Sequence, residues 1–161
     1  MFHRLLNSLV KIHNEKILDT LTTPLINIFA IEEYPHGLTQ SKINDIRKKN
    51  YTDTGGLLRY LGMKVGARIM LTTNMDISDR LVNGQLGTVK HFTLLNGQWQ
   101  IYILFDDVNA GNERKNGDNF ARRIGYVPIE KTEAKFGISN KNTTVVVTRT
   151  QFPSQKMPIC F

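Results

Sequence analysis

From residue 68 onward the sequence consists of short runs rich in β-branched and aromatic residues, and this pattern most constrains the fold. The runs, separated by turn residues, cover 68–73, 87–95, 98–107, 123–130 and 143–152. Segments of this length and composition are typical of strands. Asn96-Gly97 lies between two of them, and this dipeptide is the strongest short signal for a two-residue hairpin turn. We therefore predict an almost all-β region that forms a small barrel.

The first 60 residues follow a different pattern, with helical and strand-like segments in alternation. Apolar residues recur at helical spacing over 4–21, and Pro24 ends this predicted helix. The run 25–31 predicts a buried strand, and Thr39 is placed to cap a short helix over 40–50. The whole chain is therefore predicted to be α+β and mostly β.

Three further details follow from the local pattern. Ile43 and Ile46 are expected to point inward from the short helix. The polar stretches 51–56 and 106–119 are predicted loops, and the second is long enough to be mobile. Alternation along 99–105 places four apolar side chains on one face of a strand, namely Trp99, Ile101, Ile103 and Phe105.

The charge balance and the small number of cysteine and histidine residues limit the classes of function that the chain can have. The chain has 21 Lys and Arg against 14 Asp and Glu, a net charge of +7, which favours a polyanionic partner such as nucleic acid or an acidic membrane surface. A mildly basic soluble domain remains the alternative. The single cysteine, Cys160, excludes a disulfide framework and a cysteine zinc site, and four dispersed histidines predict no metal site. No apolar run predicts a membrane span or a secretory signal.

The glycine-bearing stretch 79–92 does not fit a phosphate-binding loop. Gly84 and Gly87 are three residues apart and Thr88 follows Gly87 directly, without a Lys between them, whereas such a loop needs Gly-x-x-x-x-Gly-Lys-Ser/Thr. A strand rather than a helix follows, so the dinucleotide fingerprint also fails. We predict a turn at Asn83-Gly84, and a tight corner or bulge at Gly87.

Acidic residues offer two further candidate sites, and we interpret both as structural. Asp106 and Asp107 are adjacent on a strand and point to opposite faces, so we predict a charged strand end. Asp76 and Asp79 are predicted turn formers. Asn74 and Ser78 belong to the same polar corner.

Basic and aromatic residues of the strand-rich part are the candidates for binding nucleic acid. Single strands are bound by positive grooves that contact phosphates and by aromatic faces that stack on bases. Composition and neighbourhood nominate Lys64, Arg68, Arg80 and Lys90 for phosphates, and His91 or Tyr102 for stacking. Arg149 and Trp99 lie in the same part of the sequence. The alternative is that Trp99 belongs to the core and the charges are solvated.

The block GLLRYLGMKVGARIMLTTNMDISDRLVNGQLGTVKHF resembles the second RecA-like lobe of Pif-family (petite integration frequency) DNA helicases. In that family a similar block leads into an inserted barrel of the Src-homology type, and the version carried by Helitron-type transposons is the most similar. FDD, VPIEK and RTQFP follow in the family's order, and the resemblance covers about 12–153. It implies that the motif positions mark the root of the inserted barrel, namely Gly66, Asn74, Asn83, Gly84 and Gly87.

The resemblance also implies a domain organisation and a function. Residues 1–60 would be part of the second lobe, 61–150 the barrel with flanking strands, and 151–161 a truncated tail. The parent activity would be ATP-dependent, five-prime to three-prime DNA unwinding in repair, recombination or telomere maintenance, in the nucleus or mitochondrion. Single-stranded DNA would be the partner.

The sequence departs from the family at both ends. Pro153 runs into SQKMPICF where the family has a segment ending in Thr-Ile-His-Lys-x-Gln-Gly. The first lobe, which would bind ATP and Mg, is missing, and we interpret both ends as truncation or frame-shift scars. No catalytic residue and no cofactor are therefore assigned, and the chain is expected to be inactive alone. The alternatives are a free-standing nucleic-acid-binding barrel, such as an RNA-directed one, and a non-functional transposon remnant.

Overall fold

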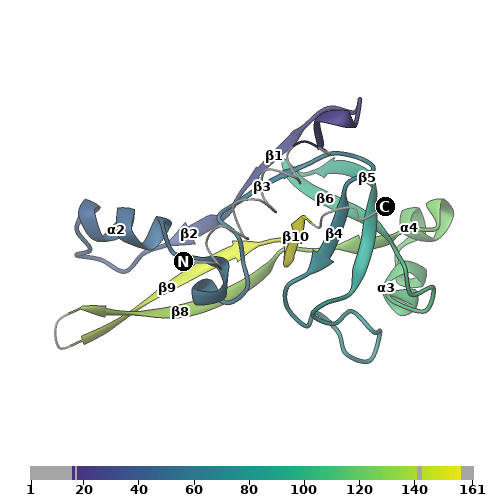
Figure 1. Ribbon diagram of the computed structural model, residues 1–161. Helices are drawn as coiled ribbons and strands as arrows, with labels where there is room; N and C mark the ends of the chain where they lie inside the picture. The colour runs from purple at the N-terminus through teal and green to yellow at the C-terminus, as the bar shows by residue number, and fades with distance from the viewer. Residues whose placement is uncertain (1–15, 17, 141–142, 157–161) are drawn as a thin grey trace, which may run out of the picture.

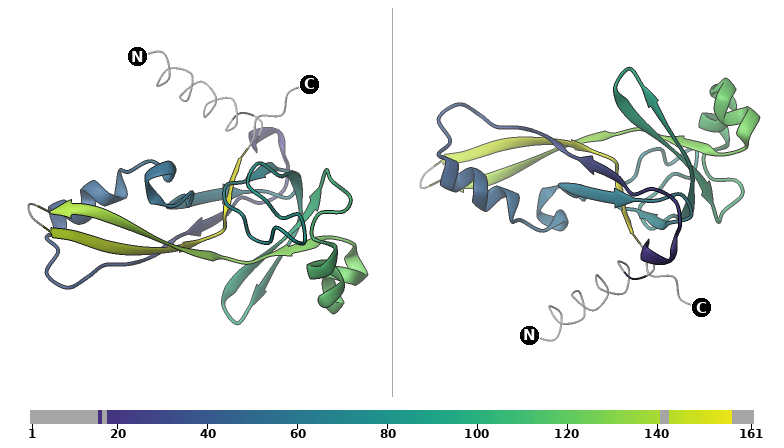
Figure 2. Two further views of the ribbon diagram at one scale, coloured as in Figure 1. Left: turned by 90° about the horizontal axis from the view of Figure 1, so that it is seen from below. Right: turned by 90° about the horizontal axis from the view of Figure 1, so that it is seen from above.

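The computed structural model describes residues 16, 18–140 and 143–156. Within these residues ten strands form three antiparallel sheets, accompanied by short helices. Figure 1 shows an elongated molecule, with α2 (Gln40–Arg47) at one end and α3 (Asn112–Gly117) and α4 (Asn119–Ile124) at the other. The same outline is visible from two further sides in Figure 2. The mostly β, α+β prediction is confirmed.

The largest sheet has five strands in the order β10-β4-β5-β6-β7, and each neighbouring pair is antiparallel. The strands, in chain order, are β4 (Arg68–Leu71), β5 (Leu86–Leu95), β6 (Gln98–Phe105), β7 (Val127–Ile129) and β10 (Ser154–Lys156). The turn between β5 and β6 has positive φ at both Asn96 (51°) and Gly97 (76°). The predicted Asn-Gly hairpin is therefore confirmed.

A three-stranded sheet, β2-β9-β8, forms the long ribbon that extends to the α2 end of the molecule in Figure 1. Its strands are β2 (Ile31–Glu33), β8 (Thr132–Asn140) and β9 (Thr143–Gln151). Helix α2 packs on it through a small cluster in which Ile46 meets Phe136 and Val147. Thr39 caps α2 as predicted, because its hydroxyl accepts the Lys42 N–H at 3.5 Å. Ile46 is buried and Ile43 half-buried, which confirms their inward orientation.

The third sheet is a two-stranded pair, β1 (Ile26–Phe29) with β3 (Tyr60–Met63). The prediction of one buried strand over 25–31 is wrong, because the segment is divided into β1 and the start of β2, and only Ile28 in it is buried. Leu25, Phe29 and Ile31 are exposed. The reason is that only one face of β1 packs on the core, so Ile28 is buried and Ile26 half-buried, whereas Phe29 on the other face is exposed.

Helical turns replace two of the predicted loops. The stretch 51–56 begins with the 3-10 helix η1 (Tyr51–Thr54), and 106–119 contains α3. Strands β3, β8 and β10 were not predicted, and 123–130 is a strand only over β7. Of the predicted helix 4–21, residues 16 and 18–20 are helical, Leu21 is not, and 4–15 and 17 lie outside the described residues. None of the described helices has the length and apolarity needed to cross a membrane.

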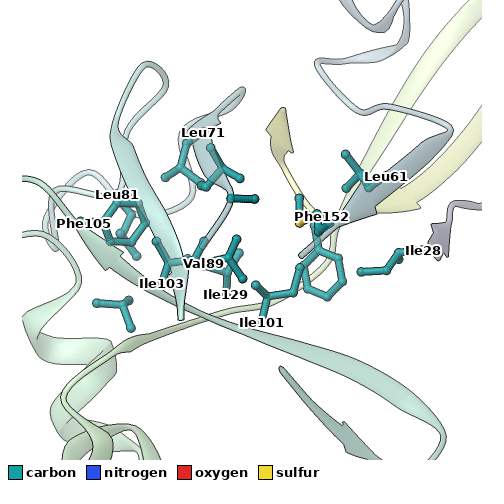
Figure 3. Packing of buried hydrophobic residues seen from close by; sticks show 14 of the residues in the cluster. Ile28, Leu61, Leu71, Leu81, Val89, Ile101, Ile103, Phe105, Ile129 and Phe152 are labelled. Carbon is teal, nitrogen blue, oxygen red and sulfur yellow. The ribbon is translucent and has the colours of Figure 1, made fainter. Parts of the chain in front are cut away.

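The main core lies between the five-stranded sheet and the β1–β3 pair (Figure 3). Ile101, Ile103 and Phe105 extend inward from one face of β6, as predicted, and Trp99 packs half-buried at the edge of the same cluster. Phe152, which directly follows β9, reaches toward Ile28 across this core (Figure 3). Burial of such side chains stabilises the fold by about 1.5–3 kcal/mol each. The core therefore joins the first and last described parts of the chain.

Candidate nucleic-acid interface

The block 79–87 is held by internal hydrogen bonds, beginning with the buried carboxylate of Asp79. One of its oxygens accepts the Glu113 N–H and the other accepts the Arg114 N–H, both at 2.9 Å. The Asp79 carbonyl accepts the Gly111 N–H at 2.7 Å. Asp79 therefore fixes the first turn of α3 to the β4–β5 connection. It is a turn residue, as predicted, but its main contacts lie more than 30 residues away in the sequence.

The neighbouring motif residues shape the same connection. The Asn74 side chain accepts the Asn83 N–H at 2.8 Å, and the Gln85 N–H closes a turn onto the Val82 carbonyl at 3.1 Å. Gly84 has a φ of 90° in that turn, a conformation that favours glycine. The predicted turn at Asn83-Gly84 is confirmed. Gly66 also has positive φ, 92°, and donates to the Val89 carbonyl at 2.8 Å.

Gly87 has a different role from the predicted one. It lies inside β5, opposite Phe105 of β6, and a Cβ there would come within 2.6 Å of the Ile103 side chain and 3.0 Å of the Leu104 carbonyl. Glycine is needed because β6 packs too closely for a side chain. The corner or bulge predicted at Gly87 is wrong. The register shift of this strand pair falls between Val89 and His91.

Two of the nominated cations are occupied by internal partners. Arg68 makes a two-pronged contact with both carboxylate oxygens of Asp106, at 2.6 and 2.5 Å, and also reaches the Thr88 hydroxyl at 3.0 Å. Hydrogen bonds from Arg68 hold the pKa of Asp106 below its usual range. The Lys64 ammonium donates to the Leu21 carbonyl at 2.9 Å. Both side chains are therefore used in the fold before any ligand is considered.

Arg80 and Lys90 are the nominated cations with the fewest internal contacts. Arg80 has a φ of 58°, which is uncommon for a residue other than glycine, and its side chain is 61% exposed. It lies 3.7 Å from the Asp107 carboxylate. Lys90 occupies the register shift of β5 and is half-buried.

Asp106 and Asp107, which pair with Arg68 and Arg80, form the predicted charged strand end. Among the described residues no three His, Cys, Asp or Glu side chains gather as metal ligands.

His91 and Tyr102 are brought together, but inside an aromatic cluster with Phe120 of α4. The ring centroids lie 5.8 Å apart for His91–Tyr102 and 5.2 Å apart for Tyr102–Phe120. Tyr102 is 2% exposed, so its ring presents no free face to a base in this conformation. The nomination of Tyr102 for stacking is corrected for this reason. His91 is half-buried and lies 5.4 Å from Phe120.

A buried ion pair that the sequence did not reveal joins β2 to β9. Arg149, 1% exposed, donates to the Glu32 carboxylate and to the Leu57 carbonyl, the latter at 3.0 Å. Burial of Glu32 opposes its ionisation, but hydrogen bonds from Tyr34 and Arg149 outweigh burial and hold its pKa below 4.5. Arg149 is therefore part of the core and not a phosphate contact. The sequence signal that could have revealed this ion pair is a charged residue inside a strand-like run, as Arg149 is in 143–152.

Comparisons with known proteins agree with this geometry. Residues 55–92 match the family model of the DNA helicase Pif1, 2B domain. The Pif1 helicase from Candida albicans is similar over 94% of this chain and 33% of its own, with a TM-score of 0.60 and 19% identity. Unliganded Pif1 from Bacteroides sp gives a TM-score of 0.55 with 19% identity, over 93% of this chain and 37% of its own. A comparison with curated protein sequences found no match.

A third solved structure is that of the Bacteroides Pif1 helicase in complex with ADP-AlF3 and ssDNA. It is similar over 92% of this chain and 27% of its own, with a TM-score of 0.51 and 19% identity. The fold is thus that of a class of DNA helicases. More particularly, the fold is similar to part of the Pif1 helicase fold and residues 55–92 are similar to its 2B domain, which confirms the expected resemblance. It spans about a third of the length of the first two helicases.

Proposed function

We propose that this chain is a piece of a Pif-type DNA helicase and contributes contacts to single-stranded DNA. In this proposal 1–60 belong to the second RecA-like lobe, 61–150 to an inserted small barrel with flanking strands, and 151–161 to the tail. The family match at 55–92 supports an inserted unit in the middle of the chain, because β4 and most of β5 lie within it.

The observation that carries the DNA proposal is the shared fold with a helicase solved in complex with ssDNA. The net charge of +7 supports it, because phosphate contacts dominate the affinity of most nucleic-acid-binding proteins. Arg80 and Lys90 are the nominated side chains that we retain for phosphates, and His91, which follows Lys90 in β5, is the nominated ring that we retain. Arg68, Lys64 and Tyr102 support the fold around them.

ATP hydrolysis is not assigned to this chain by itself. Phosphoryl transfer depends on a phosphate-binding loop, its Lys and a metal ion that together position and neutralise the phosphates. The 161-residue sequence has no Gly-x-x-x-x-Gly-Lys-Ser/Thr motif. We propose that ATP and Mg are bound by other parts of a fuller helicase, and that this chain supplies DNA contacts to it.

The test is fluorescence anisotropy of a labelled single-stranded DNA oligomer, titrated with the purified monodisperse chain at several salt concentrations. We expect binding whose logarithm falls linearly with the logarithm of salt concentration, because phosphate contacts release counterions. A duplex and an RNA oligomer of the same sequence serve as comparators, and an ATPase assay should show no DNA-dependent turnover. Preference for RNA would favour a free-standing RNA-directed module, and absence of binding by a folded chain would contradict the proposal.

A further inference from the structure

A groove of about 520 Å³ lies where the β5–β6 hairpin approaches the β2–β9 strands. The hairpin forms one wall with Leu95, Gln98 and Trp99, and Ile31 and Thr150 form the other. Ile31 and Leu95 are 50% and 54% exposed, respectively. None of the residues nominated from the sequence for phosphates or stacking lines this groove.

Trp99 is the aromatic side chain of the groove, and its orientation is held by contacts with Phe92 and the main core. Its ring meets Phe92 edge-on, with centroids 6.2 Å apart and an interplanar angle of 81°. The indole is half-buried, packed against the main core on one side and lining the groove on the other. An aromatic ring held in this way offers a preorganised surface for a planar ligand, because little side-chain freedom is lost on stacking.

The groove also has polar and charged groups of the kinds that contact nucleotides. Lys131 lines it and lies over the Phe152 ring, 5.8 Å from the centroid. The exposed amides of Asn96 and Gln98 provide donors and acceptors for base edges. The one carboxylate on the lining, Glu130, is 3.4 Å from the Arg114 guanidinium, which offsets its charge.

We propose that this groove receives one or two unstacked bases of single-stranded DNA, with a base against Trp99 and the adjoining phosphate at Lys131. The proposal rests on the proposed function and adds a stacking site to the phosphate contacts assigned to Arg80 and Lys90. The volume suits a nucleotide-sized ligand. Aromatic stacking beside a cation is the general means by which proteins hold single strands without reading their sequence. A chain of net charge +7 complements such a ligand.

Trp99 is the single tryptophan of the sequence, so its fluorescence reports on this groove alone. We expect an unlabelled single-stranded DNA oligomer to quench the fluorescence over the same concentration range in which a labelled one shows increased anisotropy. Increased anisotropy with unchanged tryptophan fluorescence would overturn the groove while leaving the proposed function intact. No increase in anisotropy would overturn both. The DNA assignment would be overturned if an RNA oligomer quenched the fluorescence more strongly than the DNA oligomer. It would also be overturned if an unrelated peptide quenched the fluorescence and the DNA oligomer did not.

Two variant pairs complete the test. Trp99→Ala should weaken binding about tenfold, the effect of losing one base–aromatic stack, whereas Trp99→Phe keeps a stacking ring and most of the affinity. Lys131→Ala should lower both affinity and the salt slope, whereas Lys135→Ala removes a cation that pairs with Glu133 and does not line the groove. Equal effects of the two lysine variants would contradict the assignment. The lysine pair decides the matter if Trp99→Ala fails to fold, which circular dichroism would show.

Discussion

The block 79–87 and the hairpin groove differ in how far their side chains are used by the fold. In the block, Asp79 holds α3, Asn83 is held by Asn74, and Gly87 accommodates β6. In the groove, Gln98 is exposed and Trp99 faces an open space of about 520 Å³. The motif residues Asp79, Asn83 and Gly87 therefore maintain the backbone geometry, and the groove open to a ligand lies at a hairpin that carries no recognisable motif.

The largest loss of stability should come from the buried ion pair. Arg149→Met leaves the Glu32 carboxylate buried without its main partner, and breaking such a pair costs about 3–5 kcal/mol. Arg59→Met is the matched control, because Arg59 reaches the same carboxylate at 3.5 Å from a side chain that is 43% exposed, and should cost less than about 1 kcal/mol. Urea unfolding monitored by circular dichroism compares the two. Similar losses would mean that Arg149 is no more important than a surface partner.

A smaller loss is expected from Gly87→Ala, about 1–3 kcal/mol, because the added methyl group would overlap Ile103 and the Leu104 backbone. Gly117→Ala is the control, since a Cβ at that helical glycine meets nothing within 4 Å, and should be neutral or stabilising. The same unfolding experiment measures both. A neutral Gly87→Ala would show that the motif glycine is not explained by the approach of β6.

Asp79→Ala should cost about 1–2 kcal/mol, the usual effect of losing a side-chain oxygen that satisfies helix N–H groups. It should also speed proteolysis within 106–118, because α3 loses its attachment to the β4–β5 connection. Asp53→Ala, at an exposed position, should change stability by less than about 0.5 kcal/mol. If the rate of proteolysis within 106–118 is unchanged in Asp79→Ala, Asp79 does not hold α3 in place.

The smallest effect is a pH dependence centred on Glu32. Because its pKa is held below 4.5 in the folded state, its contribution to stability is present above pH 4.5 and is lost as the pH falls through the lower folded value. Glu32→Gln should therefore show a shallower loss of stability below pH 4.5 than the wild type. Glu33→Gln, at an exposed neighbouring position, controls for the loss of a carboxyl group. Parallel pH profiles for wild type and Glu32→Gln would contradict the assigned shift.

Local signals predicted the elements whose causes are local. The Asn96-Gly97 turn needs two residues with positive φ, and Thr39 caps a helix that begins at the next residue, so both could be read directly. The overall α+β, mostly β character followed from composition and period. The turn at Gly84 followed from the same reasoning.

The elements that were missed depend on distant partners. Helix α3 is held by Asp79, which lies 34 residues before Glu113, and no local pattern encodes that contact. Tyr102 is covered by Phe120 of α4, so its burial depends on a helix that the sequence did not predict. The groove forms only where the hairpin meets β2 and β9, and Trp99 alone did not indicate it.

Hydrogen exchange measured by mass spectrometry, with and without a single-stranded DNA oligomer, tests most directly whether recognition and binding lie in different places. We predict that DNA slows exchange of backbone amides in 94–100 and 130–131, while exchange in 81–87, the motif residues that follow Arg80, stays unchanged. Protection of 81–87 with none at the hairpin would contradict this account, and would make the motif itself the DNA contact.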